Sequence, residues 1–250
     1  MTGTVDEIYR KNSSRPPFKG YGRTRNPMSF SAALERAKMS GKLGIIAEYK
    51  RFSPSGFKNS MNQDLRGYHR KMVEAGVDAL SILTEPDFFG GRYEDMIQSQ
   101  GMGVPLLAKD FFSSREMINS AYRCGADAVL LIADFLLPDT LTDLCSYSHR
   151  LGMEVITEFH DLRVGIGALS SGTDMLGYNR RNLRTLTMEG EERDAIRIMK
   201  KFEGIKILES GINMENIDKV IMPGYDSVLI GEALLGNQDL INRLHEIRVS

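Results

Sequence analysis

From residue 44 onward the sequence repeats short apolar segments that are separated by longer stretches with helical periodicity. Each segment is four to six residues long, which is the usual length of a buried strand. The segments are almost continuously apolar, as strands are when both faces of a sheet are covered. The eight segments are residues 44–49, 79–83, 105–108, 128–132, 154–157, 175–178, 205–208 and 227–230. Because strands that alternate with helices form parallel sheets, the chain is predicted to have an α/β fold.

The stretches between these segments carry apolar residues on one helical face. The clearest of them are residues 64–75, 115–124, 141–151, 193–201 and 214–220. Eight strands within about 190 residues favour a closed (β/α)8 TIM barrel over an open doubly wound sheet. The open sheet usually has fewer strands and a glycine-rich loop after its first strand, and this sequence has no such loop.

The length of 250 residues also fits one barrel domain. Residues 29–40 have apolar residues at helical spacing behind a capping Ser29, which predicts an extra N-terminal helix before the first strand. Residues 1–28 are rich in Ser, Pro, Gly, Lys and Arg and are predicted to be an irregular N-terminal arm, with the basic run 11–25 solvated. The chain is therefore divided into this arm, 1–28, and a single barrel catalytic domain, 29–250.

The formal net charge of −1 indicates neither a nucleic-acid partner nor an acidic membrane surface. The two cysteines, Cys124 and Cys145, lie in predicted helices without a CxxC or Cys/His spacing. That pattern favours a reducing compartment and argues against a zinc site. The start of the chain is polar, and no apolar run approaches the roughly 18 residues of a membrane span. We therefore expect a cytoplasmic protein without a signal peptide.

Charged residues stand at the ends of alternate predicted strands, and active sites of such barrels lie at the C-terminal strand ends. Glu48, Lys109, Glu158 and Glu209 end strands 1, 3, 5 and 7. Because barrel layers are built from alternate strands, these four residues are predicted to form one polar layer at the top of the barrel. Lys50 follows Glu48 by two positions and points to the same side. One such residue is usually a rim salt bridge, but several that converge on one mouth indicate a functional site.

Strand 6 ends in Asn179, and Arg181 shares its side if the chain stays extended. The turns after strands 7 and 8 contain Gly211 and Gly231. These two loops are the common phosphate site of the fold, and glycine lets backbone N–H groups approach phosphate oxygens. Turns use glycine in any case, so the pair of glycines together, rather than either alone, favours a phosphate site.

Two other loops are open to more than one interpretation. Residues 51–58, after strand 1, contain small residues, a proline and a glycine, which suit either a mobile lid over a substrate or a plain surface loop. Residues 88–91, after strand 2, begin with Phe88 and Phe89. These aromatic side chains could pack against a flat ring or merely cap the barrel.

Taken in order, these segments resemble the indole-3-glycerol-phosphate synthase family. The most specific segments are residues 45–51 with 53–56, and residues 109–111. The other matching segments are residues 79–85, 125–132, 154–158, 177–183, 209–212 and 228–232. The resemblance extends from about residue 29 to residue 245 and does not include the N-terminal arm. Three positions depart from the family: Ala108, where many relatives carry Arg, Arg180, where Asn or Ser is usual, and Asn182, where Asp is usual.

The resemblance implies a carboxy-lyase of tryptophan biosynthesis. Its substrate would be 1-(o-carboxyphenylamino)-1-deoxyribulose 5-phosphate, whose ring carbon attacks the sugar carbonyl. CO₂ and then water leave, which gives indole-3-glycerol phosphate. The resemblance calls for no cofactor and no metal. We expect a small-molecule partner only, with no nucleic acid and no membrane, and a monomer or weak homo-oligomer.

The resemblance also implies roles for individual residues. Lys109 would be the general acid at the carbonyl oxygen and Glu158 the general base, with Lys50 as a second cation at the substrate. How the two lysines divide the acid roles stays open. The remaining catalytic residues would be Glu48, Asn179 and Glu209. Substrate contacts would come from Ser53, Phe88, Arg181 and Ser210, and phosphate contacts from the backbone of Gly211, Gly231 and Glu232.

Two other classes of function stay open from the sequence. One is a Schiff-base aldolase on the same barrel, which would need a lysine with a depressed pKa. The glutamates near Lys50 and Lys109 work against that. The other is a non-catalytic barrel that binds a sugar phosphate or a partner enzyme, for which an acid and base pair would serve no purpose.

Overall fold

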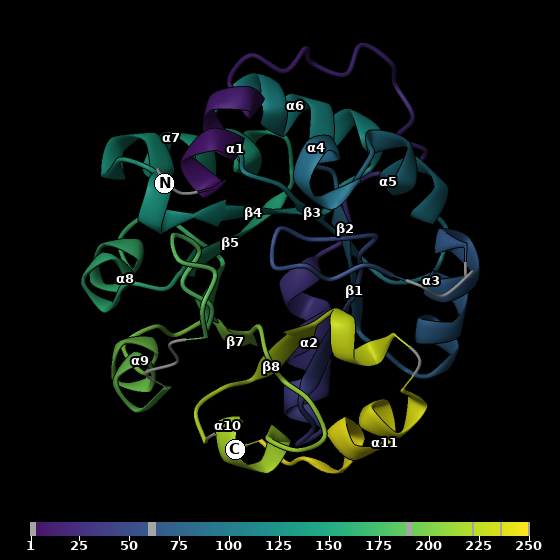
Figure 1. The fold of residues 1–250 in the computed structure, drawn as a ribbon, viewed down its shortest axis with the longest axis vertical. Coiled ribbons are helices and arrows are strands. Elements are labelled where there is room, and N and C mark those ends of the chain that lie inside the picture. Colours follow the sequence, from purple (N-terminus) through teal and green to yellow (C-terminus); the bar gives the residue numbers. More distant parts are fainter. Residues whose placement is uncertain (1–3, 60–63, 189–191, 222, 236, 250) are drawn as a thin grey trace.

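In the computed structural model, eight parallel strands form a closed barrel in the order of the sequence, and β8 pairs with β1 (Figure 1). The structure describes residues 4–59, 64–188, 192–221, 223–235 and 237–249. The strands are β1 (Gly44–Tyr49), β2 (Ala79–Leu83), β3 (Leu106–Lys109), β4 (Ala128–Ile132), β5 (Glu154–Phe159), β6 (Met175–Asn179), β7 (Ile205–Glu209) and β8 (Ser227–Ile230). The predicted TIM barrel is confirmed, and each predicted strand matches an observed one to within two residues at either end.

Helices surround the barrel on its outer side (Figure 1). They are α3 (Leu65–Glu74), α4 (Pro86–Phe89), α5 (Tyr93–Ser99), α6 (Arg115–Cys124), α7 (Pro138–Arg150), α8 (Leu162–Ala168), α9 (Glu192–Met199), α10 (Ile217–Val220) and α11 (Gln238–Glu246), with 3-10 turns η1 (Ala133–Phe135) and η2 (Glu232–Leu234). Cys124 and Cys145 lie buried and unbonded in α6 and α7, in helices as predicted. Among the described residues, no helix has the length and apolar character needed to cross a membrane.

The barrel interior changes from apolar to polar toward the C-terminal strand ends. Ile46, Leu107, Ile156 and Ile207 belong to one buried cluster inside the barrel. Two positions further along the same four strands stand Glu48, Lys109, Glu158 and Glu209. Because residues two apart on a strand share a face, the polar residues lie one layer above the apolar ones. The fold therefore directs four charged side chains into the barrel, directly above a layer of apolar side chains.

Helix α2 (Phe30–Met39) packs against the barrel and confirms the predicted extra helix. As predicted, Ser29 caps it, since its side chain accepts a hydrogen bond from the Ala32 N–H. Phe30 and Leu34 are fully buried in the same cluster as the barrel interior. Glu154, at the start of β5, accepts hydrogen bonds from the hydroxyl of Ser29. The helix therefore covers the apolar end of the barrel, opposite the polar layer.

The prediction of an irregular arm over residues 1–28 is wrong for residues 4–12, which form helix α1 (Thr4–Asn12). Val5 and Ile8 are buried on its inner face, and this tertiary contact stabilises a helix too short to persist alone. The prediction that the basic run is solvated is wrong for Arg15, Arg23 and Arg25. Figure 1 shows the segment after α1 passing over the outside of α6. Arg15 and Arg25 pair with the buried carboxylates of Asp110 and Asp127, and Arg23 donates to the Tyr122 carbonyl of α6.

Candidate active site

The Lys109 ammonium lies at the centre of the polar layer. Its Nζ is 3.1 Å from Glu209 Oε2, 3.5 Å from Glu48 Oε2 and 3.9 Å from Glu158 Oε2. The four residues come from β1, β3, β5 and β7 and meet as the sequence predicted. One cation therefore faces three carboxylates in a largely buried space.

The charges around Lys109 keep it protonated. Burial by itself lowers the pKa of its ammonium, but Glu209, Glu48 and Glu158 together outweigh that effect and hold the pKa well above its usual value. Burial likewise tends to raise the pKa of Glu48, and here the nearby Lys50 and Lys109 outweigh it, so the pKa of Glu48 is lowered. Lys109 is therefore a proton donor rather than a nucleophile, and Glu48 is a fixed anion beside it.

Glu158 has the opposite tendency. Burial and then the repulsion of Glu209 raise the pKa of its carboxyl well above its usual value, and Lys109 opposes them only in part. Asn179 Nδ2 donates a hydrogen bond of 3.0 Å to Glu158 Oε1 and fixes the orientation of the carboxyl group. A carboxyl group with a raised pKa is a stronger base when ionised, which suits it to remove protons.

A second lysine bridges the polar layer to the loop after β8. Lys50 Nζ is 3.1 Å from Glu48 Oε1 and 3.3 Å from Glu232 Oε1. Glu48 therefore contacts both lysines, one with each carboxylate oxygen. This arrangement places two ammonium groups at one cavity, as the spacing of Glu48 and Lys50 predicted.

Two adjoining cavities open above this layer and share Lys50, Lys109 and Arg181. The first has an apolar wall formed by Phe89, Phe111, Leu130, Ile132, Leu183 and Leu186. The second, of about 330 Å³, is bounded by the turns at residues 210–213 and 230–233. The site thus combines an apolar wall, two cations and a glycine-containing turn region.

Most of the predicted contact residues line these cavities. Those that do are Ser53, Arg181, Ser210, Gly211, Gly231 and Glu232. Phe88 is not among the lining residues, because it faces α1, where Lys11 Nζ lies 4.8 Å from its ring centroid. Its neighbour Phe89 lines the apolar wall instead. Two successive aromatic residues on a short helix point in different directions, and the sequence alone could not distinguish them.

The three departures from the family pattern lie around the site rather than in its polar layer. Ala108 is buried in the cluster between barrel and helices, away from the interior. Arg180 Nη1 donates a hydrogen bond to the carbonyl of Gly211 at 3.1 Å and so braces the loop after β7. Asn182 Oδ1 accepts from the backbone N–H of Arg184 at 2.9 Å and shapes the turn after β6.

Two glycines leave room for the acidic side chains of the polar layer. A Cβ on Gly177 would lie 2.4 Å from Glu209 Oε1, and one on Gly231 would lie 2.8 Å from Glu48 Oε1. Real atoms do not approach so closely, so any side chain at Gly177 must displace the carboxylate that holds Lys109. Nothing in the residue pattern around Gly177 indicates this requirement, because a strand glycine usually marks only a bulge or bend.

Gly177→Ala is expected to lower kcat by about tenfold or more, because the displaced Glu209 shifts the Lys109 ammonium. Steady-state kinetics alongside a thermal melt would measure it. Gly167→Ala is the matched control, since a Cβ there meets nothing within 4 Å and alanine favours the α8 helix. Equal kcat values for the two variants would show that the space beside Glu209 does not matter.

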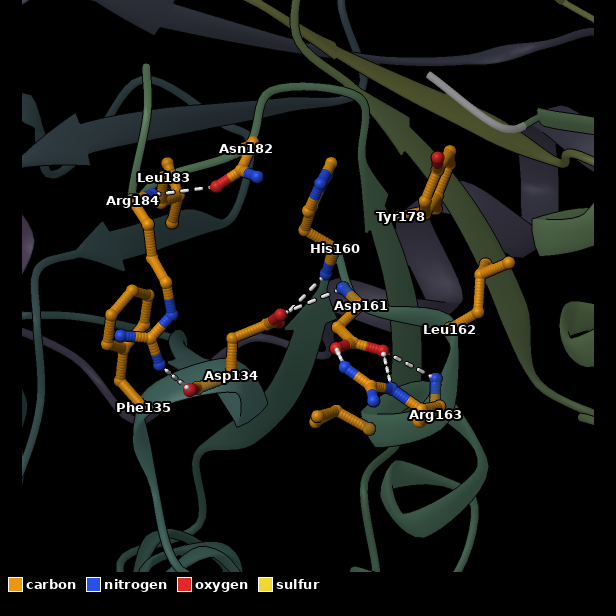
Figure 2. Close-up of a pocket in the computed structure, with 11 residues that line it drawn as sticks. Asp134, Phe135, His160, Asp161, Leu162, Arg163, Tyr178, Asn182, Leu183 and Arg184 are labelled. Carbon is orange, nitrogen blue, oxygen red and sulfur yellow. Dashed lines mark hydrogen bonds and ion pairs between the residues drawn. The ribbon is translucent and has the colours of Figure 1, made fainter. Parts of the chain in front are cut away.

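A larger cavity of about 480 Å³ lies at the rim, between the segments after β4, β5 and β6 (Figure 2). The Asp134 carboxylate accepts hydrogen bonds from the backbone N–H groups of His160 and Asp161, both at 2.8 Å. Asp161 also pairs with Arg163 at 2.6 Å, as Figure 2 shows. The carboxylates of this cavity are thus engaged in holding loops together, so we place the chemistry in the cavities around Lys109.

Comparison with known proteins shows which family the chain belongs to. A family model described as indole-3-glycerol phosphate synthase matches residues 5–247, which include most of the N-terminal arm. The indole-3-glycerol phosphate synthase of Picrophilus torridus is 40% identical over 237 residues, covering 95% of this chain and 94% of the relative. That of Thermoplasma acidophilum is 38% identical over 245 residues, covering 98% and 99%.

Among solved structures, the N-acetylmannosamine-6-phosphate 2-epimerase from Clostridium perfringens aligns with a TM-score of 0.63 at 15% identity, covering 90% of this chain and 100% of that one. The tryptophan synthase alpha subunit from Legionella pneumophila aligns with a TM-score of 0.58 at 13% identity, covering 83% and 87%. At this identity the likeness shows the barrel fold alone. The family model and the two sequence relatives show more: this chain belongs to the indole-3-glycerol phosphate synthase family.

Proposed function

We propose that this chain closes the indole ring of 1-(o-carboxyphenylamino)-1-deoxyribulose 5-phosphate, releasing CO₂ and water and giving indole-3-glycerol phosphate for tryptophan biosynthesis. The observation that carries the proposal is that Lys109 Nζ lies 3.9 Å from Glu158 Oε2, beside an apolar wall and the turns after β7 and β8. The three glutamates around Lys109 raise its pKa and so favour its protonated form. At this separation, an acid and a base can donate a proton to one atom of a small substrate and remove a proton from a neighbouring atom.

The cavities match the three parts of this substrate. The apolar wall with Phe89 and Phe111 suits the aromatic ring. The turns with Gly211 and Gly231 suit the phosphate, since backbone N–H groups there can approach its oxygens. The substrate carboxylate and carbonyl then fall between these ends, within reach of the two lysines.

In the proposed mechanism, the ring carbon that bears the carboxylate attacks the carbonyl carbon, and Lys109 gives a proton to the carbonyl oxygen as the C–C bond forms. This transfer prevents an alkoxide from developing in a buried site. CO₂ then leaves and its bonding electrons restore the aromatic ring. The new hydroxyl departs as water with a proton from Lys50 or Lys109, and Glu158 removes a proton from the adjacent carbon to complete the indole.

The environment of the lysines disfavours the Schiff-base alternative. A lysine that forms a Schiff base must be neutral to attack a carbonyl, whereas the pKa of Lys109 is raised by Glu209, Glu48 and Glu158 against the effect of burial. Borohydride trapping with a keto-sugar phosphate would detect such an intermediate. We expect no covalent adduct.

The chain is further proposed to act on this small molecule in the cytoplasm, as a monomer or weak homo-oligomer that binds no nucleic acid. Its unbonded cysteines and near-zero net charge support this. The decisive experiment is incubation with the carboxyphenylamino-deoxyribulose phosphate, followed by indole fluorescence and CO₂ release. If the chain bound this substrate but formed neither indole nor CO₂, its function would instead be that of a non-catalytic barrel that binds sugar phosphates.

A further inference from the structure

A second charged network lies directly behind the general acid, on the side of β3 that faces the N-terminal arm. Its centre is Asp110, the residue after Lys109, whose side chain is completely buried. A buried carboxylate is costly unless every oxygen is paired. The partners of Asp110 therefore show what this network is built to hold.

Four donors converge on the Asp110 carboxylate. Oδ1 accepts from Asn12 Nδ2 at 2.9 Å and from the backbone N–H of Phe111 at 2.8 Å. Oδ2 accepts from Arg15 Nη2 and from Thr84 Oγ1, both at 2.6 Å. Two of the four donors, Asn12 and Arg15, belong to the N-terminal arm. The arm thus supplies the charge that neutralises this carboxylate.

The same network fixes the backbone immediately after the catalytic lysine. The Thr84 N–H donates to the Lys109 carbonyl at 3.0 Å, and Arg15 Nη1 donates to the Thr84 carbonyl at 3.3 Å. The Asp110 side chain bonds to the N–H of Phe111, whose ring lines the apolar wall of the cavity. One arginine of the arm therefore ties together the ends of β2 and β3 at the point where Lys109 enters the site.

We infer that the N-terminal arm positions the general acid: Asn12 and Arg15 act through Asp110 to set where the Lys109 ammonium lies relative to the substrate carbonyl. The inference rests on the proposed function, in which Lys109 is that acid. Proton transfer requires hydrogen-bond reach, and a displacement of about 1 Å can cost about 10²-fold in rate. Asn12, Arg15 and Asp110 are positioning residues: Asp110 lines the first cavity, but both oxygens of its carboxylate are engaged by the four donors named above.

The arm also provides a matched control at the opposite end of the same strand. Arg25 forms a two-pronged ion pair with Asp127, with both N–O distances at 2.6 Å. The Asp127 side chain is completely buried, like that of Asp110, and accepts from the backbone N–H of Leu106 at the start of β3. Arg15 and Arg25 therefore each anchor the arm to a completely buried carboxylate, but only Arg15 lies at the catalytic end.

The test compares Arg15→Met with Arg25→Met in the full chain. Calorimetry with the substrate analogue whose carbonyl is reduced to an alcohol counts binding-competent sites, and kcat is expressed per competent site. A purely structural role lowers the number of sites and leaves kcat per site unchanged. We expect Arg15→Met to lower kcat per site by about 10- to 100-fold with little change in KM, and Arg25→Met to leave kcat per site unchanged. Arg15→Lys, which retains the charge, should recover part of the loss.

If Arg15→Met fails to fold, Asn12→Ala decides the question, because it removes one neutral donor from Asp110 and should lower kcat per site by about threefold to tenfold. Equal kcat per site in the Arg15 and Arg25 variants, or in Asn12→Ala and the parent, would overturn the inference. Such a result leaves the proposed function standing as long as Lys109→Ala is inactive. An active Lys109→Ala would instead remove the acid role on which both depend.

Discussion

Lys109→Ala is expected to lower kcat by at least about 10³-fold, because the carbonyl oxygen would gain negative charge with no proton donor in reach. Affinity for phosphate-bearing ligands should change little, since the turns with Gly211 and Gly231 hold that end of the substrate. Indole fluorescence under saturating substrate measures the rate, and titration with inorganic phosphate as a competitive inhibitor measures the binding.

Loss of a buried lysine also leaves three carboxylates without their central cation, so a control for stability is needed. Lys206 serves this purpose: its Nζ pairs with Asp226 Oδ2 at 3.5 Å at the other end of the barrel. Its side chain is 12% exposed, against 19% for Lys109, so the two substitutions remove comparably buried charges. Lys206→Ala should reduce thermal stability and keep kcat. If Lys109→Ala retained most of its rate, Lys109 would not be the general acid.

Much of the barrel could be predicted because strand and helix periods are local properties of the sequence. The apolar segments over 44–49 and 128–132 coincide with β1 and β4, since strands covered on both faces stay apolar along their length. The polar layer could be predicted from the same periodicity of the strands. Residues two positions beyond the apolar layer of alternate strands must meet, and the distances around Lys109 confirm that they do.

The features that could not be predicted depend on contacts between distant parts of the chain. Helix α1 has few apolar residues of its own, and it is the barrel that buries Val5 and Ile8. Arg15 and Asp110 are 95 positions apart, so nothing in the spacing of either residue indicates the other. Phe88 and Phe89 are adjacent on the short helix α4, and only tertiary contacts show that Phe88 faces Lys11 whereas Phe89 lines the cavity.

Glu158→Gln is expected to lower kcat by about 10²- to 10³-fold, because the amide retains the shape of the carboxyl group but cannot accept the proton. The hydrogen bond with Asn179 can persist, so the orientation of the side chain is preserved. In the parent enzyme, kcat/KM should fall with decreasing pH as Glu158 takes up a proton. That fall should begin at a higher pH than for an ordinary glutamate, because burial and Glu209 raise the pKa of Glu158.

The same raised pKa predicts that this substitution is not destabilising. A carboxyl whose pKa is higher in the folded than in the unfolded state contributes stability below the unfolded pKa, about 4.3, and loses it as pH rises through the folded value. At neutral pH, above the unfolded pKa, the raised pKa of Glu158 therefore opposes folding, and Glu158→Gln should melt at an equal or higher temperature than the parent. The difference should disappear below about pH 4.

Glu154→Gln is the control on the same strand. Glu154 accepts hydrogen bonds from Ser29 and Ser31 at the end of the barrel that α2 covers, so its loss should lower the melting temperature slightly and leave kcat unchanged. A Glu158→Gln variant that melted lower and kept its rate would reverse both expectations. It would mean that Glu158 serves the fold as a partner of Lys109 and that another group accepts the proton. A variant that is stable and slow is the outcome expected of a base held at an energetic cost to folding.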